Sequence, residues 1–183
     1  MLWQVNPHWI DDETYHWDAF KKNTHKAFLH TENIYRSPYI LEYWSERQGL
    51  PFIGELFRQG KKGEDPVMTY KRMQNLSQEQ FNDEMFDAYQ HLINFDYKRV
   101  FSITRPWANS FPDFRSCLEE KEDGWYQVRK AWCPENYGFN AIHLKVPAAS
   151  TTVQITFSGI TPAGQDYNIQ SPEKAGWRYG VVG

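Results

Sequence analysis

The sequence predicts an α+β fold, with a helical subdomain at residues 1–100 followed by an antiparallel β-sheet or partial β-sandwich at residues 124–183. Before residue 100, apolar residues recur every three to four positions between helix-capping residues. After residue 124 they alternate with polar residues at period two, as in a strand with one buried face. Residues 101–123, which contain Pro106 and Pro112, are expected to connect the two domains.

Capping signals divide the first domain into five expected helices. Asp11 and Asp12 can cap the first helix. In the second and fourth helices an N-cap residue precedes a proline at the first helical position, as Ser37–Pro38 and Asp65–Pro66 do. The expected helices span residues 11–30, 37–49, 51–60, 65–75 and 77–95.

The clearest of these helices begins at Ser77. Ser77 and Gln80 have the spacing of a capping box, in which each side chain bonds the backbone N–H of the other residue. Four apolar residues then share one face: Phe81, Met85, Tyr89 and Leu92. The carboxylates of Glu79, Asp83 and Asp87 fall on the polar face, where a solvated surface is favoured over a catalytic pair.

Three segments of the second domain have the alternation of β-strands. Their apolar positions are Tyr126, Val128 and Trp132; Ile142, Leu144 and Val146; and Val153, Ile155 and Phe157. The four residues "PAAS" between the last two segments predict a hairpin loop. The C-terminal run "GWRYGVVG" also has the pattern of a strand.

Aromatic residues are abundant and make up 17% of the chain, with 8 Trp, 11 Tyr and 12 Phe. Such rings fill cores, and they also line surfaces that stack on sugars or peptides. Trp107 lies in a proline-flanked loop and Trp132 near a strand end, so these two are candidates for such a surface. Core packing is the favoured interpretation of the aromatic residues as a whole.

Charge and hydropathy exclude several classes of partner. The net charge is -3, and no stripe of basic residues matches the footprint that a nucleic acid requires. No apolar run approaches the roughly 20 residues that a membrane span needs. Residues 1–7 are too short for a signal peptide and lack its basic n-region.

The stretch "HKAFLHTE" raises the question of a zinc site. A zinc peptidase helix needs two histidines at i and i+4, because only that spacing returns both rings to one face. His25 and His30 are five residues apart, and no two of the six histidines have the required spacing: His8, His16, His25, His30, His91 and His143. No catalytic residue, metal ligand or cofactor is therefore assigned, and the ligand-binding residues remain unknown.

The two cysteines, Cys117 and Cys133, lack a C-x-x-C spacing that would indicate zinc or redox chemistry. Either could act as a thiol nucleophile with His143, but no neighbouring residue favours a thiolate. A structural role is the better interpretation.

Three quoted stretches carry a resemblance to a known family. They are the run from "THKAFLHTENIYRSPYILEYWSERQGL" to "FNDEMFDAY", then "YGFNAIHLKVPAASTTVQITFSG", and then "AGWRYGVV". Together they resemble the later half of an uncharacterised family of secreted bacterial proteins similar to gluzincin-type zinc metallopeptidases. In those proteins a His-Glu-x-x-His helix and a third ligand precede a helical subdomain and a β-sandwich.

The resemblance implies a function for the chain. Every zinc ligand would lie upstream of Met1, and both ends of the chain are abrupt, so we expect a piece of a longer polypeptide. The expected function is the non-catalytic C-terminal portion of a secreted or periplasmic, metallopeptidase-like protein, with the N-terminal part of that protein as its partner. The alternative is a glycan- or peptide-binding module that uses exposed aromatic residues. A secreted parent would also allow a disulfide between Cys117 and Cys133.

Overall fold

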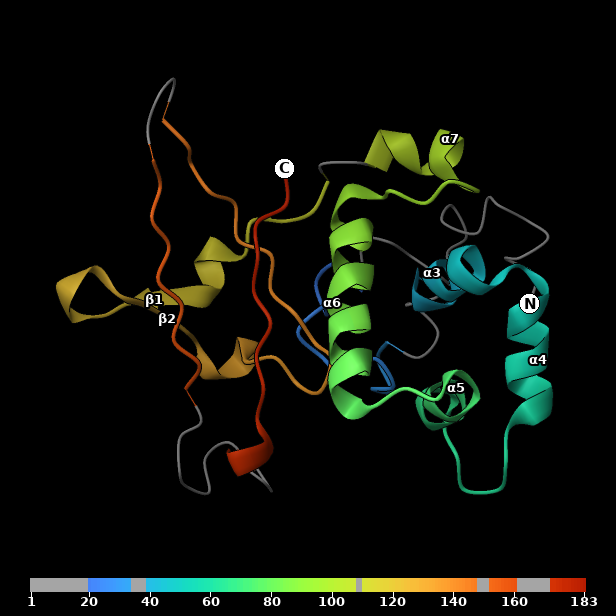
Figure 1. The fold of residues 1–183 in the computed structure, drawn as a ribbon. Helices are drawn as coiled ribbons and strands as arrows, with labels where there is room; N and C mark the ends of the chain where they lie inside the picture. Colours follow the sequence, from blue (N-terminus) through green and yellow to red (C-terminus); the bar gives the residue numbers. More distant parts are fainter. Residues whose placement is uncertain (1–19, 34–38, 108–109, 148–151, 161–171) are drawn as a thin grey trace.

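The computed structural model describes residues 20–33, 39–107, 110–147, 152–160 and 172–183. A group of helices lies on one side of the molecule and a group of extended segments on the other, with helix α6 between them (Figure 1). The described residues thus combine helices with a small antiparallel sheet, which confirms the α+β class.

The helices begin and end close to the residues that the capping signals indicate. Asp65 accepts a hydrogen bond from the backbone N–H of Met68 at 2.7 Å, and Ser77 and Gln80 form both bonds of the capping box, at 2.8 and 3.2 Å. The proposed cap at residues 37–38 lies outside the described residues. The helices are α3 (Tyr39–Gln48), α4 (Pro51–Gln59), α5 (Pro66–Gln74), α6 (Gln78–Asn94) and the short α7 (Phe101–Thr104).

The expected helix at residues 11–30 is wrong over its described part. From Phe20 to Asn33 the chain forms successive turns, in which the N–H groups of residues 23, 26, 30 and 33 each bond the carbonyl three positions back. A continuous helix needs the carbonyl of Thr24 for its own ladder, but that carbonyl accepts the N–H of Phe139 at 2.8 Å. This carbonyl therefore bonds a distant segment of the chain in place of the next turn of a helix. The expected start of this helix lies outside the described residues.

The core of the helical part is aromatic, as the composition predicts. Trp44 has none of its surface exposed, and its ring stacks on Tyr70 with 4.0 Å between the centroids. Phe52 meets the same Tyr70 ring edge-on at 5.6 Å. Each such ring pair adds about 0.5–1.5 kcal/mol beyond the area that it buries. The predicted apolar face of α6 enters this core through Phe81, Met85, Ala88 and Leu92.

The sheet is smaller than the period-two pattern predicts. Strand β1 (Leu118–Glu120) pairs antiparallel with β2 (Tyr126–Val128), and Glu119 lies opposite Gln127. Trp132, which the sequence places in the same strand as Tyr126 and Val128, lies instead in a 3₁₀ turn.

The other predicted strands are extended but do not form a ladder of backbone hydrogen bonds within the described residues. Near residue 143 the backbone is bonded by side chains: the N–H of His143 donates to Asp113 at 3.3 Å, and its carbonyl accepts from Arg115. These bonds occupy groups that a neighbouring strand would otherwise use. The predicted hairpin loop at residues 147–150 lies mostly outside the described residues, and a β-sandwich is not formed by them.

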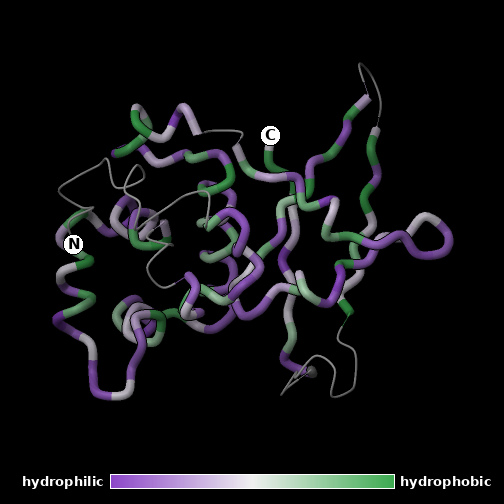
Figure 2. The backbone as a smooth tube through the Cα atoms, turned by 180° about the vertical axis from the view of Figure 1, so that it is seen from behind, coloured by the Kyte–Doolittle hydropathy of each residue, from purple (hydrophilic) through white to green (hydrophobic). Residues whose placement is uncertain are grey.

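The C-terminal segment returns to the helical part and runs along α6. Arg178 Nε lies 2.5 Å from Asp83 Oδ1, and further along the helix Asn94 donates to the carbonyl of Gly183 at 3.5 Å. Between them, a Cβ added at Gly180 would lie 2.8 Å from the far edge of the Phe86 ring, so the segment passes close to this side chain of α6. Apolar stretches also follow the extended segments outside the helical core (Figure 2).

Candidate functional site

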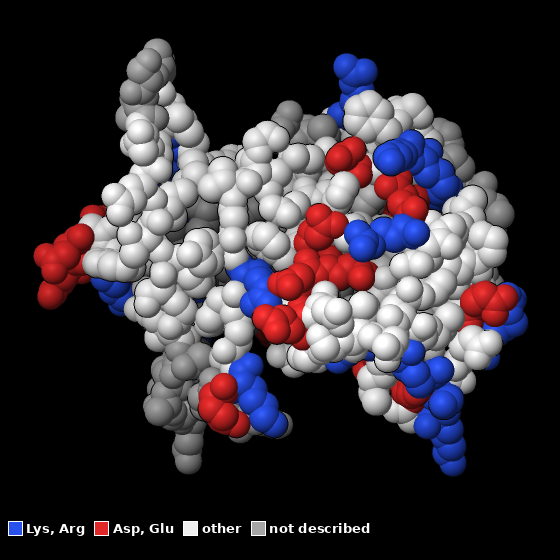
Figure 3. Space-filling model, in the orientation of Figure 1, with Lys and Arg blue, Asp and Glu red and all other residues white. Residues whose placement is uncertain are grey.

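A charged cleft of about 590 Å³ lies between α3, α6 and the turn that follows α6. Acidic and basic side chains gather beside one another on this face of the molecule (Figure 3). The cleft is lined by Glu42, Tyr43, Ser45, Glu46, Arg47, Gly49, Leu50, Asp87, His91, Lys98 and Arg99.

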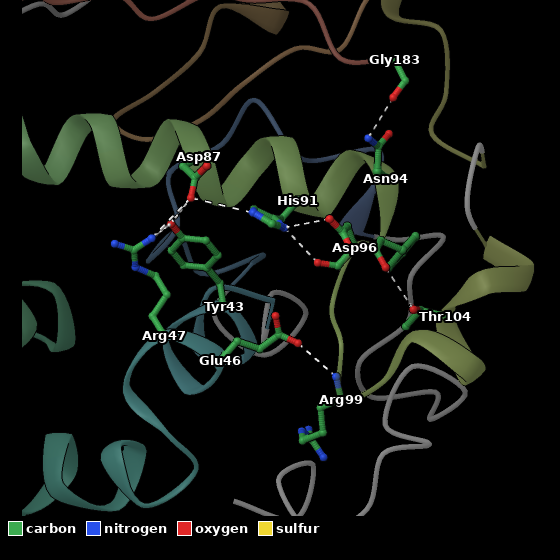
Figure 4. A network of polar contacts seen from close by, with 11 residues as sticks. Tyr43, Glu46, Arg47, Asp87, His91, Asn94, Asp96, Arg99, Thr104 and Gly183 are labelled. Atoms are coloured by element: carbon green, nitrogen blue, oxygen red, sulfur yellow. Dashed lines mark hydrogen bonds and ion pairs between the residues drawn. The ribbon is translucent and has the colours of Figure 1, made fainter.

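Helical spacing brings the first group of these side chains together. Tyr43 and Arg47 lie one turn apart on α3 and face Asp87 of α6 (Figure 4). The Tyr43 hydroxyl donates to Asp87 and accepts from Arg47 Nη1 at 3.1 Å, and Arg47 lies 3.6 Å from the same carboxylate. Burial, together with the hydrogen bond to Asp87, raises the pKa of Tyr43. This tyrosine therefore stays protonated and acts as a donor.

His91 lies next to this network on α6 (Figure 4). Its Nδ1 lies 2.9 Å from the carbonyl oxygen of Asp96, and because a carbonyl can only accept, Nδ1 carries the hydrogen. Its Nε2 lies 3.9 Å from the Asp87 carboxylate (Figure 4). The backbone carbonyl of Asp96 thereby fixes a hydrogen on Nδ1 and orients the ring toward Asp87.

A buried ion pair closes the other end of the cleft. Arg99 donates to both oxygens of Glu42, at 2.7 Å from Nε and 2.5 Å from Nη2, and its backbone N–H donates to Glu46 at 3.1 Å. The Glu42 side chain has no exposed surface, and burial raises its pKa although Arg99 partly offsets the effect. The pair attaches the turn after α6 to α3. The carboxylates of the cleft mainly accept hydrogen bonds from donors of the cleft itself. These bonds hold α3, α6 and the turn after α6 together.

The histidines occupy separate settings. His25 is buried against Trp132, with 4.7 Å between ring centroids, whereas His30 accepts from the N–H of Glu32 at 3.1 Å. His91 lies in the cleft and His143 is exposed. His8 and His16 lie outside the described residues. Among the described residues, no group of three His, Cys, Asp or Glu side chains is placed to hold a metal ion.

The cysteines are both free thiols, so the disulfide that we expected is not present in this structure. Cys117 is buried, and the Cys133 thiol donates to the carbonyl of Arg129 at 3.7 Å. Burial raises the pKa of both thiols, which favours the unreactive protonated form.

The two tryptophans that the sequence suggested for ligand binding are not exposed platforms. Trp107 and Trp132 are half-buried and pack against the core. Exposed aromatic rings instead cluster on the extended segments, where Phe157 stacks on Tyr179 at 4.7 Å and meets Trp177 edge-on at 6.0 Å. The alternation in "GWRYGVVG" was the signal that could have indicated this cluster.

Over the described residues, none of the helices has the length and apolar character to cross a membrane. No curated protein and no solved structure matches the chain. The model of a family of unknown function, DUF6055, matches residues 1–183, so the chain belongs to that family.

Proposed function

We propose that this chain is a non-catalytic scaffold within a secreted, metallopeptidase-like protein, and that its extended segments form one layer of a β-sandwich. The rest of that protein would supply the facing layer. One observation carries the proposal: six apolar side chains on the two segments each keep at least 41% of their surface exposed. They are Ile142, Leu144, Val146, Val153, Ile155 and Phe157.

The alternation explains why a second layer fits. In an extended segment, side chains at every second position share a face. The apolar residues occupy one set of positions, and polar residues such as His143, Lys145 and Gln154 occupy the other. A sheet with one apolar face becomes stable in water when that face packs against another layer. Contiguous exposed apolar surface of this kind is typical of an interaction site.

The packing of the tryptophans supports a scaffold in the helical part. Trp44 is fully buried, and Trp107 and Trp132 pack against the core, so these rings stabilise the fold. The secreted location and the peptidase-like parent rest on the sequence resemblance. Fractionation of the source cells tests the location, with the protein expected outside the cytoplasm.

Cysteine labelling tests the facing layer directly. Ile155→Cys lies on the apolar face and Gln154→Cys on the opposite face of the same segment, so the two variants form a matched pair. In the complete natural gene product we expect maleimide to label Gln154→Cys rapidly and Ile155→Cys slowly, with the sites identified by mass spectrometry. Equal, rapid labelling at both positions would show that no layer covers residue 155.

A glycan- or peptide-binding module is the second candidate, favoured by the exposed cluster of Phe157, Trp177 and Tyr179. Exposed stacked rings present flat apolar faces to sugar rings. Calorimetry with cello-, xylo- and chito-oligosaccharides and with proline-rich peptides tests it. Binding should be lost in Trp177→Ala and retained in Trp125→Ala, which removes an exposed ring outside the cluster. Equal affinities of the two variants would exclude this cluster as the binding surface.

A further inference from the structure

His25 is the one buried histidine among the described residues, with 7% of its surface exposed. Its Nδ1 is enclosed and has no hydrogen-bond partner among the described residues. The ring packs on Trp132 at 4.7 Å with an interplanar angle of 53°. Histidine is the side chain whose charge changes near neutral pH, so its burial beside an indole ring makes this contact sensitive to protonation.

Main-chain bonds on both sides of His25 join two distant segments. The carbonyl of His25 accepts the N–H of Glu135, and the carbonyl of Thr24 accepts the N–H of Phe139, both at 2.8 Å. The N–H of Ala27 donates to the Glu135 carboxylate at 2.8 Å. These bonds hold residues 20–33 against residues 132–139.

The fit at this junction leaves little room for adjustment. A Cβ added at Gly138 would lie 2.1 Å from the carbonyl oxygen of His25, so the two backbones are in direct contact. A side chain at residue 138 would force the two segments apart.

The charged groups around His25 come from both segments. On its own segment are Lys26, His30 and Glu32, with Lys26 paired to Glu32 at 2.6 Å, and on the opposite segment is Glu135. Burial lowers the pKa of His25 below its ordinary 6.5, Lys26 and His30 lower it further, and Glu135 and Glu32 oppose the change. The neutral ring is the form that the folded junction accepts.

We propose that His25 is a pH-sensitive latch: its neutral ring allows residues 20–33 to pack on residues 132–139, and its protonation releases them. An imidazolium carries an N–H on each ring nitrogen. Nδ1 of His25 is enclosed, and no acceptor among the described residues is placed to bond an N–H at this nitrogen. The Trp132 face attracts a cation, but it does not replace the lost hydration.

The direction of the effect follows from linkage. The folded junction binds a proton less readily than the unfolded chain does, so its stability is complete above pH 6.5 and is lost as the pH falls through the lowered folded pKa. Release would uncover aromatic side chains between the two segments, among them Phe20 and Phe28 of residues 20–33 and Phe139 of residues 132–139, which line a small cavity. An acidic compartment would thereby change the surface of the protein.

Hydrogen exchange of the whole chain, followed by mass spectrometry and corrected for intrinsic rates, tests the latch at about pH 7.5 and about pH 5. In the wild type, peptides covering residues 20–33 and 132–139 should lose protection at the acidic pH, while peptides of α6 keep theirs. His25→Gln and His25→Phe should abolish that pH-dependent difference, and His143→Gln, which changes an exposed histidine, should leave it unaltered.

An unchanged wild-type pattern between the two pH values would overturn the proposal, and so would an acid-induced loss that persists in both His25 variants. If neither variant folds, an NMR titration of the His25 ring in the wild-type protein decides. A midpoint below 6.5 is expected, and a midpoint at or above that value would also overturn the latch.

Discussion

Removing Arg99 from the buried Glu42–Arg99 pair should lower the free energy of unfolding more than removing Glu42. Glu42 has none of its side chain exposed, whereas Arg99 keeps 22%. Arg99→Met would leave the carboxylate enclosed without its counter-charge, and Glu42→Met would leave a guanidinium that can still reach water. Methionine at position 99 keeps the backbone N–H that bonds Glu46.

The exposed fractions of the two side chains determine how much each substitution should change the free energy of unfolding. Stranding a buried charge costs about 3–5 kcal/mol, so Arg99→Met should lower the free energy of unfolding by an amount in this range near neutral pH. Glu42→Met should cost about 1–3 kcal/mol, because the remaining charge is partly hydrated. The double variant replaces the pair by apolar side chains and should lie within about 1 kcal/mol of the wild type. These values predict a coupling free energy of at least about 3 kcal/mol.

Urea unfolding of the four proteins measures the cycle. Glu55→Met is the control, because it breaks the exposed pair with Arg58 and should change the free energy of unfolding by less than about 1 kcal/mol. Because burial raises the pKa of Glu42, the cost of Arg99→Met should also shrink in acid, where the carboxylic acid form is populated. Additive single variants, or a larger cost for Glu42→Met than for Arg99→Met, would refute the reasoning.

Three further predictions follow from local contacts. Ser77→Ala should cost about 1 kcal/mol by removing the capping-box acceptor of α6, and an unchanged urea midpoint would contradict the cap. The bond from Arg72 lowers the pKa of Glu64 to about 2, so its contribution to stability is present above 4.5 and lost as the pH falls toward 2; a carboxyl NMR titration should find that midpoint, and Arg72→Gln should return it toward 4.5. In thiol titration without reductant, Cys133 should react in the folded protein before Cys117, and the unfolded protein should contain two reactive thiols. If the unfolded protein contained no reactive thiol, the two cysteines would be joined in a disulfide.

Most of the helical part could be predicted from sequence because its signals are local. The side chain of Ser77 bonds an N–H three residues away, and Asp65 does the same for α5. Such caps form between near neighbours whatever the rest of the chain does. Periodicity then oriented α6 correctly, since Phe81 and Met85 are buried and Asp83 is exposed.

The wrong prediction of a helix at residues 11–30 and the missed charged cleft both arise from contacts between residues that are distant in sequence. The turns at residues 21–33 depend on carbonyls that bond residues 135 and 139, more than a hundred positions away. The cleft joins Glu42 to Arg99 across 57 positions, and nothing in the spacing of either residue indicates the other. Sequence by itself therefore determined the α+β class, the ends of helices α4, α5 and α6, the aromatic core and the alternation of the extended segments, because each rests on backbone geometry or on near neighbours. Tertiary structure decided which backbone groups leave their local partners and which charges are buried together, because those choices depend on contacts between distant parts of the chain.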